Sequence, residues 1–205
     1  MENKKVIIIG AGFSGLAAAS VLAQDGFEVT VIEKNSSPGG RARKFAENGF
    51  TFDMGPSWYW MPDVFEKYFA LFGKKPEDYY KLQRLDPSYR FYFGKDEIVD
   101  IPSTFNDVLE IFEREEAGAG EALKKFLIEA EYKYKIAMSK FVYKPGLSMF
   151  EFAQPEMLAS VFRLDMFSSF DKHLKSYFKS PRLRQMLEFP ILFLGGTAKN
   201  TPALY

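Results

Sequence analysis

The sequence contains no cysteine and only one histidine, His173, among its 205 residues. The lack of cysteine excludes a disulfide scaffold, a thiolate nucleophile, cysteine-ligated zinc or iron–sulfur clusters and a flavin attached through cysteine. A single histidine leaves little scope for a catalytic triad or for a metal site built from several imidazoles. We therefore expect no metal site, and we expect His173, which follows Lys172, to lie on the surface.

A net charge is also lacking, because 27 acidic and 27 basic side chains cancel. Without a global positive field we expect no nucleic-acid partner. Charged residues make up 26% of the chain and hydrophobic residues 47%, which is typical of a folded protein rather than a disordered one. Aromatic residues are abundant instead, with 22 Phe, 11 Tyr and 2 Trp. They indicate a large apolar surface, which either forms a core or binds an apolar ligand.

A long apolar helix that could span a membrane is absent as well. Residues 6–24 form an uncharged run of 19 positions after two lysines, as in a signal peptide or a membrane span. The run contains three glycines, which disfavour a continuous helix. It is better explained as a strand, a glycine turn and a helix. We expect a cytoplasmic protein, peripheral on the cytoplasmic face of a membrane.

The first 33 residues have the pattern of a dinucleotide-binding β-α-β unit. Residues 6–9 are a β-branched apolar run, which predicts a strand buried on both faces of a parallel sheet. Residues 10–15 follow at once and match G-x-G-x-x-G. Small residues then predict a helix over 16–23, and residues 28–32 predict a second strand that closes on Glu33.

Each motif residue has a physical role in that unit. Gly10 allows a tight turn, Gly12 lets the backbone approach a pyrophosphate, and Gly15 lets the helix pack closely on the strands. The helix N-terminus then faces the phosphates. Glu33 lies 18 residues beyond Gly15, which suits an acid that binds a ribose hydroxyl and repels the 2′-phosphate of NADP. The unit by itself leaves FAD and NAD open.

A second glycine segment follows the unit. Gly39 and Gly40 allow close backbone approach, and Arg41 supplies a planar cation for phosphate oxygens. Alternating apolar residues over 45–52 predict a short hairpin that leads to a turn at 53–57. Such a glycine segment is often an ordinary turn, but its place beside a dinucleotide unit favours a phosphate-binding role.

Taken in order, these features resemble the flavin amine oxidase superfamily. The resemblance rests on residues 10–15, Glu33, Gly39-Gly40-Arg41 and Asp53-x-Gly55-Pro56-Ser57. Within the superfamily the chain is most similar to the bacterial-type phytoene desaturases and the related carotenoid desaturases, isomerases and retinol saturases. Pro62 after the turn and the run from Leu194-Gly195-Gly196-Thr197 to Tyr205 support this branch. The likeness is looser between residues 65 and 190.

The resemblance implies FAD as the cofactor and a long apolar polyene, similar to phytoene, as the substrate. The enzyme would remove hydrogen from C–C bonds in carotenoid biosynthesis. A carotenoid isomerase, a retinol-saturase-like flavoenzyme and a non-catalytic truncated remnant stay open as alternatives. Members of the family are more than twice as long, so we expect an N-terminal fragment that is inactive by itself. The oligomeric state is not indicated.

The resemblance also implies a set of FAD-binding residues. Gly10, Gly12, Ser14 and Gly15 would contact the pyrophosphate, and Glu33 would contact the adenosine ribose. Gly39, Gly40 and Arg41 would line the phosphate side, and Gly55, Pro56 and Ser57 would lie near the isoalloxazine. Removal of a proton from the carbon beside the hydride donor needs a carboxylate or an equivalent base. Glu151, within an apolar stretch, is the candidate, although a Glu at that place is also typical of an exposed first helical turn.

The rest of the sequence predicts one further hairpin and several helices. A hairpin is expected over 90–101 and helices over about 105–116, 123–141, 155–178 and 181–192. The predicted fold class is α/β, a Rossmann-like FAD-binding unit that is incomplete without its C-terminal half. Its parts are a FAD-binding part (1–72), a β-rich substrate segment (73–103) and a helical substrate or membrane region (104–205).

Basic residues are concentrated in two of the predicted helices. Residues 124–144 carry six Lys against two Glu, and residues 163–184 carry six Lys or Arg against two Asp. Interleaved aromatic and basic side chains suit an anionic membrane surface. An ordinary core with a solvated basic face explains the same pattern.

Overall fold

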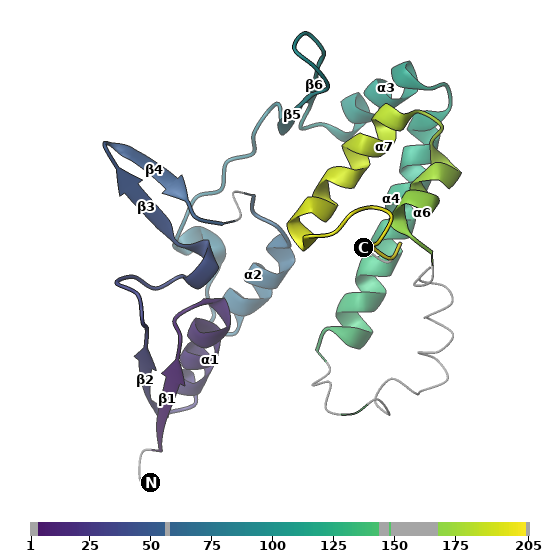
Figure 1. The fold of residues 1–205 in the computed structure, drawn as a ribbon. Helices are drawn as coiled ribbons and strands as arrows, with labels where there is room; N and C mark the ends of the chain where they lie inside the picture. Colours follow the sequence, from purple (N-terminus) through teal and green to yellow (C-terminus); the bar gives the residue numbers. More distant parts are fainter. Residues whose placement is uncertain (1–3, 56–57, 144–147, 149–167, 204–205) are drawn as a thin grey trace. The chain divides into compact units, whose positions relative to one another are not determined.

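The computed structural model describes residues 4–55, 58–143, 148 and 168–203 (Figure 1). It combines short β-strands with helices, as the α/β prediction requires. The chain divides into two compact units, Met1–Gln83 and Arg84–Tyr205. Each unit is described by itself below. Among the helices of the described residues, none is both long enough and apolar enough to cross a bilayer.

The first unit begins with the predicted β-α-β arrangement. Strand β1 (Lys5–Ile9) leads into helix α1 (Phe13–Gln24), which returns to strand β2 (Glu28–Ile32). The two strands are parallel and pair from Lys5 opposite Glu28 to Ile9 opposite Ile32. The Gly10 N–H donates to the Ile32 carbonyl at 2.7 Å, so the glycine turn starts at the carboxyl ends of both strands.

The prediction that β1 is buried on both faces is wrong: one face is partly buried and the other is exposed. Ile8 faces α1, where its methyl group lies 3.4 Å from the position a Cβ would take on Gly15. On the other face Ile9 is 87% exposed, and Ile7 and Ile32 are exposed beside it. The second face is exposed because, among the described residues, helix α1 covers this two-stranded sheet on one side and no element covers the other.

A tight hairpin follows the second glycine segment, as predicted. Strands β3 (Lys44–Glu47) and β4 (Phe50–Asp53) are antiparallel. Asn48 and Gly49 join them with φ values of 50° and 83°, the positive values that a type I′ turn requires. Helix α2 (Pro62–Ala70) and a 3₁₀ turn, η2 (Pro76–Asp78), complete the first unit.

The second unit consists of a hairpin and helices. Strands β5 (Tyr89–Tyr92) and β6 (Ile98–Ile101) are antiparallel. The helical elements are α3 (Phe105–Glu115), α4 (Ala119–Ile136), the π-helical turn η3 (Ala137–Phe141), α6 (Phe170–Tyr177), α7 (Pro181–Glu188) and the 3₁₀ helix η5 (Phe189–Leu194). The predicted hairpin and the predicted helices at 105–116 and 123–141 are confirmed, and the part of the 155–178 prediction before residue 168 lies outside the described residues.

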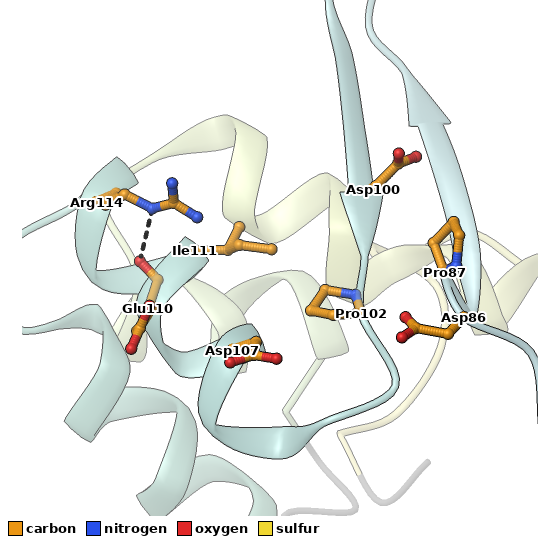
Figure 2. Close-up of a pocket in the computed structure, with 8 residues that line it drawn as sticks. All are labelled: Asp86, Pro87, Asp100, Pro102, Asp107, Glu110, Ile111 and Arg114. Atoms are coloured by element: carbon orange, nitrogen blue, oxygen red, sulfur yellow. Dashed lines mark hydrogen bonds between the residues drawn. The ribbon is translucent and has the colours of Figure 1, made fainter.

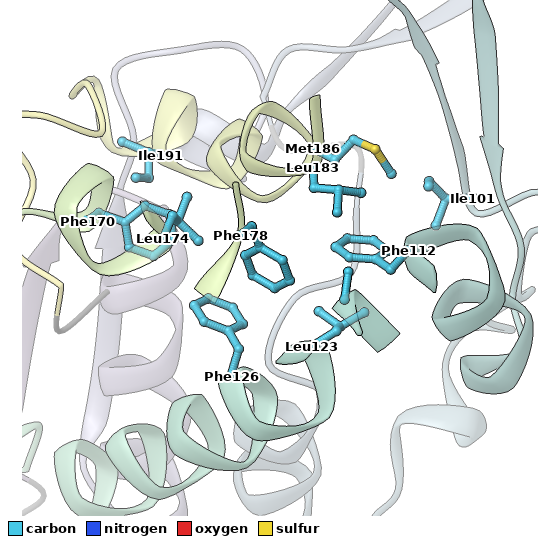
Figure 3. Close-up of a cluster of buried hydrophobic side chains, with 11 residues drawn as sticks. Ile101, Phe112, Leu123, Phe126, Phe170, Leu174, Phe178, Leu183, Met186 and Ile191 are labelled. Carbon is cyan, nitrogen blue, oxygen red and sulfur yellow. The ribbon is translucent and has the colours of Figure 1, made fainter. Parts of the chain in front are cut away.

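The hydrophobic core of the second unit is built mainly by helices α3, α4, α6, α7 and η5 (Figure 3). Leu174, Phe178 and Leu183 have no exposed surface. The cluster consists of Ile101, Phe112, Ala119, Leu123, Phe126, Phe170, Leu174, Phe178, Leu183, Met186 and Ile191. These residues come from β6, α3, α4, α6, α7 and η5, and from Phe178 directly after α6, so four phenylalanines of this unit are used as core.

The expectation that His173 lies on the surface is wrong. Its side chain is only 11% exposed, and its ring packs against Phe126 and Tyr177 at centroid distances of 5.7 and 5.3 Å. Its Nε2 lies 3.5 Å from a carboxylate oxygen of Glu129. The neighbouring lysine suggested a solvated position, but the turn of α6 directs His173 towards α4 instead.

Candidate functional site

The N-terminus of α1 forms one side of the candidate site. The first hydrogen bond of the helix runs from the Leu16 N–H to the Gly12 carbonyl at 2.9 Å. The amides of Phe13, Ser14 and Gly15 precede this bond and point out of the first turn. Together with the positive end of the helix dipole they suit an anion such as a diphosphate.

Gly15 allows this turn to close. A Cβ atom at residue 15 would lie 2.0 Å from the carbonyl oxygen of Gly10. No side chain can occupy that space without moving the turn. The third glycine of the motif is therefore required by the packing of helix on strand, as the sequence predicts.

Glu33, directly after β2, is tied to the glycine turn by its carboxylate. Its Oε2 accepts a hydrogen bond of 2.8 Å from the Ala11 N–H, and its Oε1 accepts bonds of 2.9 and 2.6 Å from the backbone and side chain of Asn35. These bonds, that from Ala11 foremost, lower the pKa of Glu33 from 4.5 to about 2. The carboxylate is therefore charged at neutral pH, and its remaining lone pairs can accept from a ribose hydroxyl.

The second glycine segment lies directly against the first. The Gly39 N–H donates to the Ala11 carbonyl at 2.7 Å. Gly40 has a φ of +58°, and a Cβ there would lie 3.1 Å from the Cα of Gly12. Two segments separated by more than 25 positions thus form one backbone-lined surface with no side chain between them.

The end of β4 closes this surface. A Cβ on Gly55 would lie 2.0 Å from the carbonyl oxygen of Arg41, so Gly55 packs on the backbone of the second glycine segment. The Arg43 guanidinium donates to the Gly40 carbonyl at 3.1 Å and holds that segment in place. The Arg41 side chain is exposed.

The structure thus brings together most of the residues that the sequence selects. They are Gly10, Gly12, Ser14, Gly15, Glu33, Gly39, Gly40, Arg41 and Gly55. Pro56, Ser57 and the candidate base Glu151 lie outside the described residues. Sequence reasoning missed Ala11, Asn35 and Arg43. Ala11 contributes backbone groups, Asn35 binds the Glu33 carboxylate and Arg43 binds the Gly40 carbonyl, so no sequence motif indicates these residues.

A hollow of about 540 Å³ in the second unit has a different character (Figure 2). It is lined by Asp86, Pro87, Asp100, Pro102, Asp107, Glu110, Ile111 and Arg114. Two of its carboxylates already have partners: Asp86 accepts the Ser103 N–H at 3.1 Å, and Asp100 binds the Arg90 guanidinium. Within the described residues no group of three acidic or imidazole side chains is placed to hold a metal ion.

The fold and the site define a dinucleotide-binding unit, and comparison with known proteins agrees. The family model described as the NAD(P)-binding Rossmann-like domain matches residues 8–74. Among solved structures, wild-type putrescine oxidase bound to putrescine superposes with a TM-score of 0.56 at 21% identity. That match covers 98% of this chain and 40% of the oxidase, and it supports the fold alone.

Sequence comparison narrows this class. The chain is 43% identical to a carotenoid 3,4-desaturase of Haloarcula japonica over 206 aligned residues, which cover 100% of this chain and 42% of that protein. It is 34% identical to a 4,4'-diapophytoene desaturase (4,4'-diaponeurosporene-forming) of Staphylococcus aureus, with 98% of this chain and 40% of that enzyme covered. The chain is thus similar to carotenoid desaturases over nearly its whole length. It spans about two fifths of the length of these curated relatives, and a Rossmann unit in a chain similar to them implies FAD.

Proposed function

We propose that the protein uses FAD to remove hydrogen from C–C bonds of a carotenoid precursor, as a desaturase of the phytoene type. The observation that carries this proposal is the backbone-lined surface formed by Gly12 and Gly40, with the Glu33 carboxylate beside it, in a chain whose relatives are named carotenoid desaturases. A surface without side chains fits a diphosphate that must lie against the backbone.

The residues fit FAD in separate ways. The α1 amides beside Gly12 and Ser14 would hold the diphosphate, and the Glu33 carboxylate would accept from the adenosine ribose. Arg41 and Gly40 would line the phosphate side, and Gly55 would lie near the isoalloxazine ring. FAD supplies the hydride acceptor when it is bound. The charged Glu33 disfavours a dinucleotide with a 2′-phosphate at this place.

The proton that leaves the substrate needs a base, for which Glu151 stays our proposal. A carboxyl group among apolar side chains has a raised pKa, so its carboxylate form is a stronger proton acceptor. A Glu151→Gln variant tests this role. If Glu151 is the base, kcat falls while FAD content is unchanged; a kcat equal to that of the unmodified protein contradicts the assignment.

The experiment that tests the function uses the complete product of the gene. It is purified to measure flavin absorption and co-expressed with a phytoene source for pigment analysis. New conjugated double bonds support desaturation. Unchanged bond counts with altered geometry indicate isomerisation, loss of a double bond indicates a saturase, and a colourless protein with unchanged pigment indicates a remnant. A Glu33→Lys variant should lose the flavin; retention contradicts the ribose assignment.

We also propose that the protein works at a membrane surface, because its water-insoluble substrate resides in a bilayer. One stripe of α4 supports this proposal: Lys125, Ile128, Tyr132 and Lys135 recur at helical spacing and are all exposed. Apolar and aromatic side chains flanked by lysines suit an anionic lipid surface. An Ile128→Ser/Tyr132→Ser variant should float poorly with anionic vesicles, whereas Tyr92→Ser, an exposed aromatic on the hairpin, should not differ from the unmodified protein.

A further inference from the structure

A row of aromatic rings begins at the cofactor turn of the first unit. Phe13 meets Phe65 of α2 edge to face at a centroid distance of 5.9 Å, and Phe65 lies 4.7 Å from Tyr59. Tyr59 in turn meets Tyr80 at 5.8 Å. These four residues are called the aromatic row below. They come from three separate segments, so the row is a product of the fold rather than of one apolar run.

The row is continuous with the proposed FAD site. Phe13 directly follows Gly12 and is the first residue of α1, and its side chain is 63% exposed. Tyr59 lies four positions beyond Gly55, the glycine that packs on Arg41. The first glycine segment, through Phe13, and the turn after β4, through Gly55, therefore both lie close in sequence to the aromatic row.

The row offers rings and little polarity. The two phenol groups, Tyr59 OH and Tyr80 OH, hydrogen-bond to each other at 2.5 Å. Burial and this bond raise the pKa of Tyr59, so that its hydroxyl stays neutral. A surface of neutral rings whose hydroxyls bind each other suits a ligand that has no polar groups.

Both tryptophans of the sequence lie in the same segment. Trp58 and Trp60 flank Tyr59 and are exposed. Large rigid rings supply contact area at low entropic cost, which matters for a ligand bound by shape alone. Exposed tryptophans beside a cofactor site also give a spectroscopic signal for the ligand.

We infer that the aromatic row, together with Trp58 and Trp60, is the wall of the substrate site along which a polyene chain lies as it reaches the cofactor. The inference rests on the proposed function and assigns residues to it. The occupant is a hydrocarbon chain because the row lies beside the proposed cofactor site and its side chains offer no charge for a polar ligand. A covering segment of the protein itself is the competing occupant.

Phe65→Leu in the complete, FAD-loaded protein tests the row, because it removes the central ring and keeps an apolar side chain. We expect unchanged FAD content and a KM for the polyene raised about tenfold, with kcat changed less. Phe72→Leu is the matched control, since Phe72 contacts Tyr68 rather than the row; it should leave both constants unchanged. An unchanged KM in Phe65→Leu, or a loss of FAD in place of polyene affinity, overturns the inference.

Tryptophan fluorescence separates this inference from the proposed function. A polyene that absorbs at the emission wavelength of tryptophan should quench the emission of Trp58 and Trp60, which is identified by its absence in a Trp58→Phe/Trp60→Phe variant. The Phe65→Leu variant should need about ten times more polyene for the same quenching. Quenching without turnover in the unmodified protein supports polyene binding at the aromatic row and contradicts the proposed desaturase function. Turnover without quenching overturns the assignment of the aromatic row to the substrate site and leaves the proposed desaturase function unaffected. The same conclusion follows if the tryptophans are shielded from acrylamide before polyene is added.

Discussion

Gly12 and Gly40 approach each other so closely that a Cβ atom on Gly40 would lie 3.1 Å from the Cα of Gly12. The two residues belong to separate glycine segments, one before α1 and one after β2. The Gly39 N–H reinforces the contact through its bond to the Ala11 carbonyl. The cofactor surface therefore depends on a contact between two backbones, and any side chain placed there occupies the space of the ligand or of the partner segment.

Gly40→Ala should weaken FAD binding at least about tenfold in the complete protein, because its Cβ meets Gly12 in addition to the cost of a positive φ. Gly26→Ala is the control: Gly26 has a φ of +86° but nothing within 4 Å of its Cβ position. It should lower the melting temperature yet retain FAD. Flavin content after gel filtration distinguishes the two variants, and equal FAD loss in both would show that strain alone matters.

Glu33→Gln should weaken FAD binding about tenfold, because hydrogen bonds to a charged acceptor are stronger than those to an amide. Titration of the apoprotein with FAD measures the effect. Glu28→Gln at the start of β2 is the control, since the Glu28 carboxylate forms an exposed pair with Lys5 at 3.8 Å. Equal affinities in Glu33→Gln and the unmodified protein would contradict the ribose role.

The same carboxyl group predicts a pH dependence of the glycine turn. The pKa of Glu33 is lowered from 4.5 to about 2, so its stabilising bond to Ala11 is fully present above pH 4.5 and is lost as the pH falls towards 2. Hydrogen exchange of the Ala11 amide should show protection that declines within this window. In Glu33→Gln the protection should not change over the same range, and an identical decline in both proteins would assign the effect to another group.

The local parts of the fold could be predicted from the sequence. Strands β1 and β2, the helix between them and both hairpins follow from short patterns of apolar residues, glycine and turn residues. The close packing at Gly15 was also expected, because that glycine belongs to a motif whose mechanics are known. These features depend on neighbours within about 30 positions.

Features that depend on distant contacts could not be predicted. The exposed face at Ile9 depends on which elements cover the sheet, and the buried position of His173 depends on α4 packing against α6. The bond from Ala11 to Glu33 uses a backbone group, which every residue carries, so residue identity gives no signal. Composition likewise could not tell the aromatic core of the second unit from the exposed rings of the first.

Glu116 is expected to stabilise the second unit by capping α7. Its carboxylate accepts the N–H groups of Lys179 at 2.9 Å and Ser180 at 2.7 Å, just before the helix begins. Glu116→Ala should therefore lower the free energy of unfolding by about 1–2 kcal/mol. Urea denaturation measures this. Glu110→Ala, an exposed glutamate on α3, should change stability by less than ~0.5 kcal/mol, and similar losses in the two variants would contradict the capping role.

Lys133 forms a buried ion pair that joins α4 to the end of the described chain. Its side chain is 5% exposed, and its Nζ donates to Glu129 at 2.7 Å and to the Ala203 carbonyl at 3.0 Å. Glu129 is 30% exposed and also accepts the Tyr177 hydroxyl at 2.6 Å. Removing the cation takes this ion-pair partner from the Glu129 carboxylate and this donor from the Ala203 carbonyl, in a poorly solvated place.

Lys133→Met should lower the free energy of unfolding by about 2–3 kcal/mol, somewhat less than a fully buried pair because Glu129 retains some solvent. Lys135→Met is the matched control on the same helix, since its pair with Glu131 is exposed on both sides and is worth less than ~0.5 kcal/mol. A double Lys133→Met/Glu129→Gln variant should recover part of the loss, because the unpaired carboxylate is then gone. Urea denaturation of the three variants checks all three values; if Lys133→Met and Lys135→Met lose equal stability, the buried pair contributes no more than a surface pair.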